Sequence, residues 1–442
     1  MLEDVWLRSV LLSRAAVVRA GQTDVVTDDG WISALATYAG RLHAHAGPDH
    51  HVVSALGAWM LVALCAPLAD DETRAEMAEV LGADPTEAAQ FAAKLLAQPH
   101  PLVAAAAGVW IAPAVSTPAM EQWRAGLPTV VTTGDIPTQE ALDAWATACT
   151  LGLIEHFPLK VTPELVCLLA TALATKVSWE VPFDVVDAKE LAPSPWVTGV
   201  QRVLSSPGCD PRHRQYIAET DRAGTVGVHL TGARGGLLVG SVIATDQEVP
   251  AADVLAVAHT IVSAEAREPR SVASRSLFDL PLGDGAIWSI TEEAVETKSR
   301  DGREEAVTSI LPAWSADTTV DLDHEDLGYP AAARAIKKVL GLPGLIYDAK
   351  QTALARYSAV GFEAAAITHL AMAMSRPSTR PGYRRDATVR FGHPFAVVAV
   401  AGEDRQSASS TGTPNPWDGL PVFSAWVSEP GEVEGAETQP RN

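Results

Sequence analysis

Histidine and acidic side chains are the groups of this chain that could bind a metal or transfer protons, and they gather in two short stretches. Four histidines stand close together near the N-terminus: His43, His45, His50 and His51. The intervening Gly47-Pro48-Asp49 favours a solvated loop over a set of metal ligands. His324-Glu325-Asp326 is the nearest approach to the HExxH pattern of metalloproteases, but the second histidine is missing, so we expect a solvated turn. We therefore predict no metal site.

Other patterns typical of enzymes are absent from the sequence. It contains no GxSxG, and no GxGxxG follows a predicted strand. The glycine-rich residues 232–236 are not followed by the Lys-Ser or Lys-Thr pair of a phosphate-binding loop. The four cysteines form no CxxC pair and indicate buried free thiols in a reducing compartment: Cys65, Cys149, Cys167 and Cys209. The sequence therefore offers no recognised catalytic, phosphate-binding, zinc or redox motif.

Residues 360–375 are the stretch in which we expect the function to lie. They are small or flexible and apolar, with one acid, Glu363. Alanine, leucine and methionine favour a helix, and an acid suits a first helical turn. Read at a period of two, the same stretch presents an almost wholly apolar face from Phe362 to Met374, which is typical of a buried strand. Periodicity leaves both structures open.

Length, composition and charge narrow the class of protein. The 442 residues are 47% hydrophobic, which is ample for a large core, and no run approaches the ~20 apolar residues that span a bilayer. The formal charge of −21 argues against nucleic acid or an anionic membrane as a partner, because both bind basic surfaces. The N-terminus carries Glu3 and Asp4 and lacks the basic start of a secretory signal, so we expect a cytoplasmic location.

Helical and strand patterns are mixed along the chain and favour an α+β fold. Residues 138–157 predict a helix, and residues 165–178 are apolar throughout, which fits either a buried strand or a helix. Residues 225–230 and 237–244 flank the glycine-rich turn and predict a β-hairpin. Further elements are expected as strands at 102–112, 389–400 and 420–427 and as helices at 251–267 and 330–340.

Several segments, taken in order, resemble the serpin family. Trp145, Thr150 and Ile154 fall at the spacing of the family's helix pattern W-V-x-x-x-T-x-G-x-I. Lys176 and residues 179–183 are similar to K-G-x-W-x-x-P-F, which ends a central strand in the family. The other similar segments are a helix pair at 54–64 and 71–82, closing strands at 393–395 and 421–423 with 429–430, and a loop hinge at 361–368. The resemblance spans residues 34–430.

The resemblance implies a divergent, bacterial-type serpin. N-terminal helices would pack on a large mixed β-sheet beside smaller sheets, with an exposed reactive-centre loop near residues 359–388. One domain would cover residues 1–430, and residues 431–442 would form a disordered acidic tail. In this family a serine protease cleaves the loop, which then inserts into the sheet as a new strand while the protease stays acylated. The resemblance thus implies a monomeric suicide inhibitor of this kind, which is not itself an enzyme and needs no cofactor, because the chemistry belongs to the protease.

Two groups of residues would carry that activity. The hinge of the loop would consist of Gly361, Phe362, Glu363, Ala364, Ala365, Ala366 and Thr368. The usual family spacing from Gly361 puts the cut at Met374–Ser375 or Ser375–Arg376. Arg376 and Arg380 both precede prolines, which lack an N–H and constrain the bond, so cleavage there should be poor. The expected protease is therefore elastase- or subtilisin-like.

Some positions depart from the family pattern. Gly57 and Thr171 replace the usual serine and asparagine beneath the main sheet, and Ala359 and Phe362 replace the usual acid and small residue of the hinge. These departures favour an alternative, a non-inhibitory serpin-fold protein that is a protease substrate or a binding module. A hydrolase with dispersed serine, histidine and aspartate is a third hypothesis, without a motif in its favour. The sequence leaves the three open.

Overall fold

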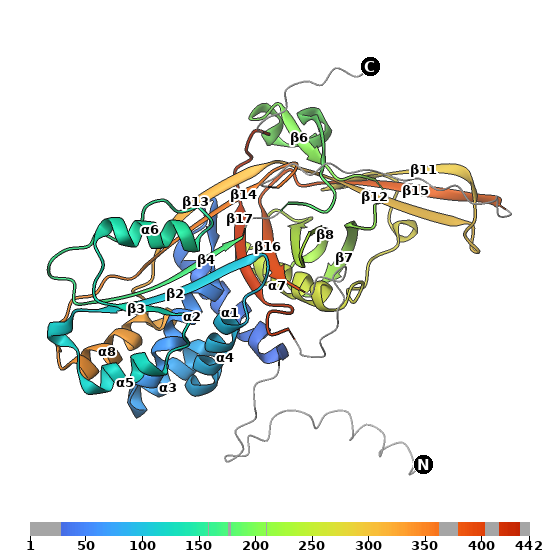
Figure 1. Ribbon diagram of the computed structural model, residues 1–442. Helices are drawn as coiled ribbons and strands as arrows, with labels where there is room; N and C mark the ends of the chain where they lie inside the picture. The colour runs from blue at the N-terminus through green and yellow to red at the C-terminus, as the bar shows by residue number, and fades with distance from the viewer. Residues whose placement is uncertain are drawn as a thin grey trace, which may run out of the picture.

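The computed structural model describes residues 28–157, 159–175, 178–208, 210–361, 379–402 and 415–433. In this part of the chain, helices lie mostly in the N-terminal half, and strands form four sheets (Figure 1). The mixture confirms the α+β prediction. The α-helices are α1 (Asp28–Ala46), α2 (Ala55–Cys65), α3 (Asp71–Leu81), α4 (Pro85–Ala97), α5 (Pro118–Gly126), α6 (Gln139–Cys149), α7 (Ala251–Arg267) and α8 (Tyr329–Leu340).

One six-stranded sheet has the order β1-β17-β16-β9-β8-β7, and all its neighbouring strands are antiparallel. Its strands are β1 (His51–Val53), β17 (Pro421–Val427), β16 (Phe395–Ala401), β9 (Leu237–Ala244), β8 (Gly224–Ala233) and β7 (His213–Thr220). Val398 and Val242 face α7, while Ile243 belongs to the main core on the other side. Because both faces are covered, the central strands are apolar almost throughout.

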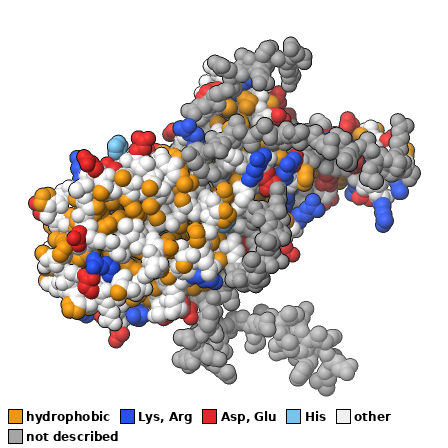
Figure 2. Space-filling view, viewed as in Figure 1, with side chains coloured by type: hydrophobic (Ala, Val, Ile, Leu, Met, Phe, Trp, Pro, Cys, Tyr) orange, Lys and Arg blue, Asp and Glu red, His pale blue; other side chains and the backbone are white. Residues whose placement is uncertain are grey.

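A second six-stranded sheet has the order β10-β11-β15-β12-β6-β5. Its strands are β10 (Gly283–Asp284), β11 (Trp288–Thr297), β15 (Arg380–Arg390), β12 (Arg303–Leu311), β6 (Arg202–Ser205) and β5 (Asp184–Asp187). β15 lies between β11, which is antiparallel to it, and β12, which is parallel. These three strands protrude from the body, and Figure 2 shows charged side chains along them. Arg385 anchors the projection by binding Glu292 at 2.8 Å and lying over the ring of Phe278.

The remaining strands form two smaller sheets that face the same core. One has the order β3-β2-β4 and the other pairs β13 with β14. Their bounds are β3 (Thr132–Gly134), β2 (Val103–Ile111), β4 (Cys167–Thr175), β13 (Trp314–Asp321) and β14 (Lys350–Tyr357). α6 packs on β2 and β4 through Leu142 and Trp110. Helix α2 lies on the opposite face of β4, against β17.

The structure confirms most of the predicted helices and strands. It also decides between strand and helix for residues 165–178, which the sequence left open. Residues 165–178 contain a strand, β4, and the hairpin is β8–β9 with Gly235 and Gly236 at positive φ. The predicted helix 138–157 is wrong in its second half, because Leu151 (φ 55) and Gly152 (φ 79) turn the chain after α6. The predicted strand 389–400 is two strands, the end of β15 and β16, with Pro394 between them.

Three further predictions need correction. Residues 380–388 of the predicted loop are part of β15, because pairing on both sides holds them extended. The predicted tail begins too early, since Gly431 pairs with Ala313 and Val433 is buried. The solvated loop is wrong for His43 and His51, which are buried and hydrogen-bonded to each other at 2.6 Å. No helix in the described part of the chain is long and apolar enough to cross a membrane.

Candidate functional site

The candidate site is the gap between β4 and β14, the facing edges of the two small sheets. The structure describes no strand pairing between them (Figure 1). The core-facing residues of β4 are only half-buried, and on the side of the gap no strand of the described residues pairs with β4: Cys167, Leu169, Thr171, Leu173 and Thr175. Their neighbours on the other face, Leu168 and Ala170, are buried under α6. An edge strand with unpaired backbone groups is a template for one more strand.

Two cavities lie along the gap. The end of the gap near the start of α2 is called the lower end, and the end near Trp179 is called the upper end. The lower cavity, of about 90 Å³, is lined by residues of both edges, including Leu173 and Thr352. The upper cavity, of about 60 Å³, is lined by Thr175, Leu354 and the aromatic rings of Trp179, Trp314 and Tyr357. The lining of the upper cavity is mainly apolar, whereas the lower cavity also has polar side chains such as Gln351 and Thr352. A polypeptide strand, which brings both apolar side chains and backbone polar groups, would fit this combination better than a charged ligand.

The start of α2 forms the floor of the gap and is tied to both edges. The side chain of Gln351, on β14, accepts a hydrogen bond from Ser54 N (3.0 Å) and donates one to Ser54 O (2.8 Å). On β4, the hydroxyl of Thr171 donates to Gly57 O at 2.8 Å. The Ser54 side chain caps α2 by accepting from Gly57 N and donates to Val422 O. These bonds hold the two edges at a fixed separation above one helix end.

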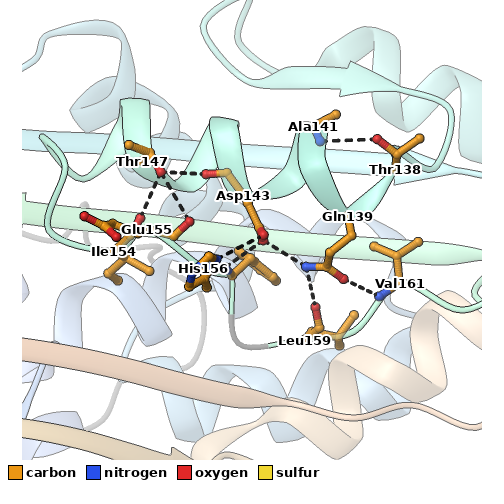
Figure 3. Close-up of polar contacts among 11 residues, drawn as sticks. Thr138, Gln139, Ala141, Asp143, Thr147, Ile154, Glu155, His156, Leu159 and Val161 are labelled. Atoms are coloured by element: carbon orange, nitrogen blue, oxygen red, sulfur yellow. Dashed lines mark hydrogen bonds and ion pairs between the residues drawn. The ribbon is translucent and has the colours of Figure 1, made fainter.

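Helix α6 and the segment after it cover the outer side of the gap (Figure 3). Gln139 donates to Leu159 O and accepts from Val161 N, so the returning chain is bound to the first turn of the helix. Asp143 accepts from Gln139 and from Phe157 N, and these two donors hold the pKa of its carboxyl below the ordinary value. A strand that enters the gap must pass beneath this unit.

The upper end of the gap is closed by direct pairing. Residues 178–183, the closing segment, follow β4, and residues 358–361 follow β14. The indole of Trp179 donates to Ser358 O at 2.8 Å, and Phe183 N donates to Ala359 O at 2.9 Å. A bridge between Ser178 and Gly361 completes the contact. The two edges therefore meet at this end and separate below it.

Among the predicted site residues, the structure places Gly361 and Ala359 at this closed end. Gly361 has a φ of 80°, a conformation that favours glycine and turns the chain. The other predicted hinge and scissile residues lie outside the described part of the chain: Phe362, Glu363, Ala364, Ala365, Ala366, Thr368, Met374, Ser375 and Arg376. Trp145, Thr150 and Ile154, singled out by their spacing, all line the lower cavity.

Comparison with solved structures identifies the architecture. Over 92% of its length the chain is similar to tengpin, a thermophilic serpin, in the native state, at 15% sequence identity and a TM-score of 0.58, covering 96% of that chain. The chain has the serpin fold. Serpin48 of the insect Tenebrio molitor is similar at 14% identity and a TM-score of 0.55, with 92% of this chain and 99% of that chain covered. Human thyroxine-binding globulin in complex with its ligand is similar at 13% identity and a TM-score of 0.57, covering 92% and 100%.

The sequence itself matches no family model and no curated protein. The likeness to serpins therefore lies in the arrangement of helices and strands and in a few short motifs in the same order. The two substituted positions meet at the floor of the gap, where the hydroxyl of Thr171 on β4 donates to Gly57 O in α2.

Sequence reasoning missed two side chains that shape this site. Gln351 is the polar member of an otherwise apolar face of β14 that continues with Ala353 and Tyr357, and such an isolated amide is a signal that could have been used. His213, which binds the closing segment, stands in a strand without a motif around it, and its partner lies far away in the sequence. Only the fold brings the two together.

Proposed function

We propose that this chain is a protease inhibitor that acts as a suicide substrate. A serine protease cleaves the segment after Gly361, and the part still attached to β14 inserts between β4 and β14. The gap is the observation that carries the proposal, because β4 and β14 face each other without a described strand between them, above a floor of bonds from α2 to both strands. A segment that turns back at Gly361 would run antiparallel to β14 and place its apolar face, which begins at Phe362, toward the core.

The position of β15 supports an insertion that depends on cleavage. β15 follows the proposed loop directly and is paired with β11 over Trp288–Thr297 and with β12 over residues 303–310. An uncut loop could fill the gap only if β15, at its C-terminal end, separated from β11 and β12. Cleavage removes this restraint without breaking either ladder.

The proposal assigns the covalent chemistry to the protease. Its serine attacks the scissile carbonyl, the amide bond breaks, and an ester joins the enzyme to the new C-terminus of the inserting segment. If insertion is faster than hydrolysis, the ester is carried away from the position in which water attacks it. The inhibitor needs no catalytic residue and no cofactor for these steps, and we propose that it works as a monomer.

We propose Met374–Ser375 or Ser375–Arg376 as the scissile bond and an elastase- or subtilisin-like protease as the partner. Arg384, an alternative for a trypsin-like protease, lies within β15 between two neighbours, where a protease would have to unpair the strand. Mass spectrometry of the cleaved chain locates the bond. A dominant cut after Arg384 would contradict this assignment.

Incubation with a panel of serine proteases tests the proposed function. We expect an adduct that survives SDS and contains one protease and the N-terminal part of this chain. Clean cleavage without an adduct would instead favour a substrate or binding role, for which Ala359 and Gly57 and the fold shared with thyroxine-binding globulin are the supporting observations.

A further inference from the structure

The closing segment, residues 178–183, is bound on two sides, and the side away from β14 has a histidine at its centre. His213, the first residue of β7, donates from Nε2 to Val181 O at 2.7 Å and is buried. Glu180 N adds a bond to Gly232 O. On the other side, Phe183 N and the Trp179 indole bind residues 358–361. The closing segment can keep its bonds to residues 358–361 only while it stays in this position.

A second histidine supports His213 from the neighbouring strand. His229, on β8, is fully buried, and its Nε2 lies 3.2 Å from His213 Nδ1. Because Val181 O can only accept, His213 carries its proton on Nε2 and its Nδ1 accepts from His229. The ring of Phe183 packs edge-on against His213 with centroids 4.7 Å apart. The pair therefore fixes both the backbone and an aromatic side chain of the closing segment.

We propose that His213 is a positioning residue for strand insertion, which sets how readily the closing segment releases residues 358–361 at the upper end of the gap. The inference rests on the proposed function, since it concerns the entry of the loop into the same gap. An inserting strand must replace the bonds between the closing segment and Ala359 and Ser358. Weaker attachment at Val181 lets the segment move and lowers the barrier to that exchange.

The charges around His213 give the proposal a pH dependence. Burial lowers the pKa of His213 and, more strongly, that of His229. The bond to Val181 O and the charges of Asp210 and Asp184 raise the pKa of His213, while the charge of Arg212 lowers it. Burial is the largest cause, and the net effect is a lowered pKa. The neutral pair therefore stabilises the closed end above the ordinary histidine pKa of about 6.5, and this contribution is lost as the pH falls below that value.

Uptake of a synthetic peptide by the intact protein tests the inference without a protease. The probe is a fluorescein-labelled peptide with the sequence of residues 362–374, and the rate of uptake is followed by fluorescence polarisation. His213→Ala should take up the peptide about two- to tenfold faster than wild type, the range expected for one hydrogen bond. His100→Ala is the matched control, because His100 is also buried and donates to a backbone carbonyl, Gly402 O, away from the closing segment.

His213→Gln separates positioning from general stability, since its amide can still donate to Val181 O but does not titrate. We expect it to match wild type at pH 7.5 and to lack the acceleration that wild type shows at pH 5.5. The inference is overturned if His213→Ala and His100→Ala behave alike, if His213→Gln keeps the pH response, or if no protein takes up the peptide. If peptide uptake follows these expectations but no protease forms an adduct, the inhibitory function is contradicted and the role of His213 in strand insertion is still supported.

Discussion

Two parts of the molecule enclose the same core but differ at their strand edges. One is the complete sheet, β1-β17-β16-β9-β8-β7, and the other is the divided sheet, which consists of β3-β2-β4 and β13-β14 with the gap between them. In the complete sheet Ile243 lies on β9, a strand paired with β8 on one side and β16 on the other, and is 0% exposed. In the divided sheet Leu173 lies on β4, faces the same core and is only half-buried, because β4 lacks a described partner toward β14. The central strands of the complete sheet are paired on both sides, whereas no described strand pairs with the edges of β4 and β14 that face the gap.

The largest effect that should separate the two sheets comes from truncating these two side chains. Ile243→Ala should cost about 2–5 kcal/mol of unfolding free energy in both the intact and the cleaved protein, because its cavity is fully buried in either state. Leu173→Ala should cost less than Ile243→Ala in the intact protein and approach the same cost after cleavage, when an inserted strand buries the site. Guanidinium unfolding of wild type and the two variants, each intact and cleaved, measures these costs. An equal cost for Leu173→Ala before and after cleavage would show that the gap stays open.

A smaller effect is expected at Phe362, where the loop should first enter the divided sheet. An oversized residue in a packed site costs about 1–3 kcal/mol, and each ~1.4 kcal/mol on the barrier slows entry about tenfold. The wild-type protein should therefore behave largely as a substrate, and Phe362→Thr should reduce the number of inhibitor molecules consumed per protease trapped. Titration of residual protease activity measures this ratio. An unchanged or higher ratio for Phe362→Thr would mean that Phe362 has a pocket shaped for it.

The difference between the two sheets also explains which features the sequence could predict. Local patterns were sufficient for α7, for the β8–β9 hairpin and for β2, because periodicity and glycine positions act within one element. The end of α6 was missed because two consecutive positive-φ residues, Leu151 and Gly152, turn the chain there. The two edges of the gap were not predictable from either strand alone, since β4 and β14 lie far apart in the chain. Motifs nevertheless marked its lining at Trp145 and its closure at Trp179.

Residues held by distant partners were the least predictable. Arg385 was assigned to an exposed loop, yet it binds Glu292 and packs on Phe278 within a central strand. His43 was assigned to a solvated loop, yet its side chain is buried. Both of its ring nitrogens have hydrogen-bond partners, His51 and Ser424. A polar residue is buried when the fold supplies partners, and those partners do not appear in its local sequence.

The melting temperatures of the intact and the loop-cleaved protein test the central claim most directly. If the cut segment fills the gap, the protein gains roughly ten ladder hydrogen bonds at about 0.5–1.5 kcal/mol each, which is comparable to the whole stability of a typical domain. The cleaved protein should therefore melt far above the intact one. Equal melting temperatures, in a sample shown by mass spectrometry to be fully cut between residues 361 and 380, would contradict strand insertion into the gap.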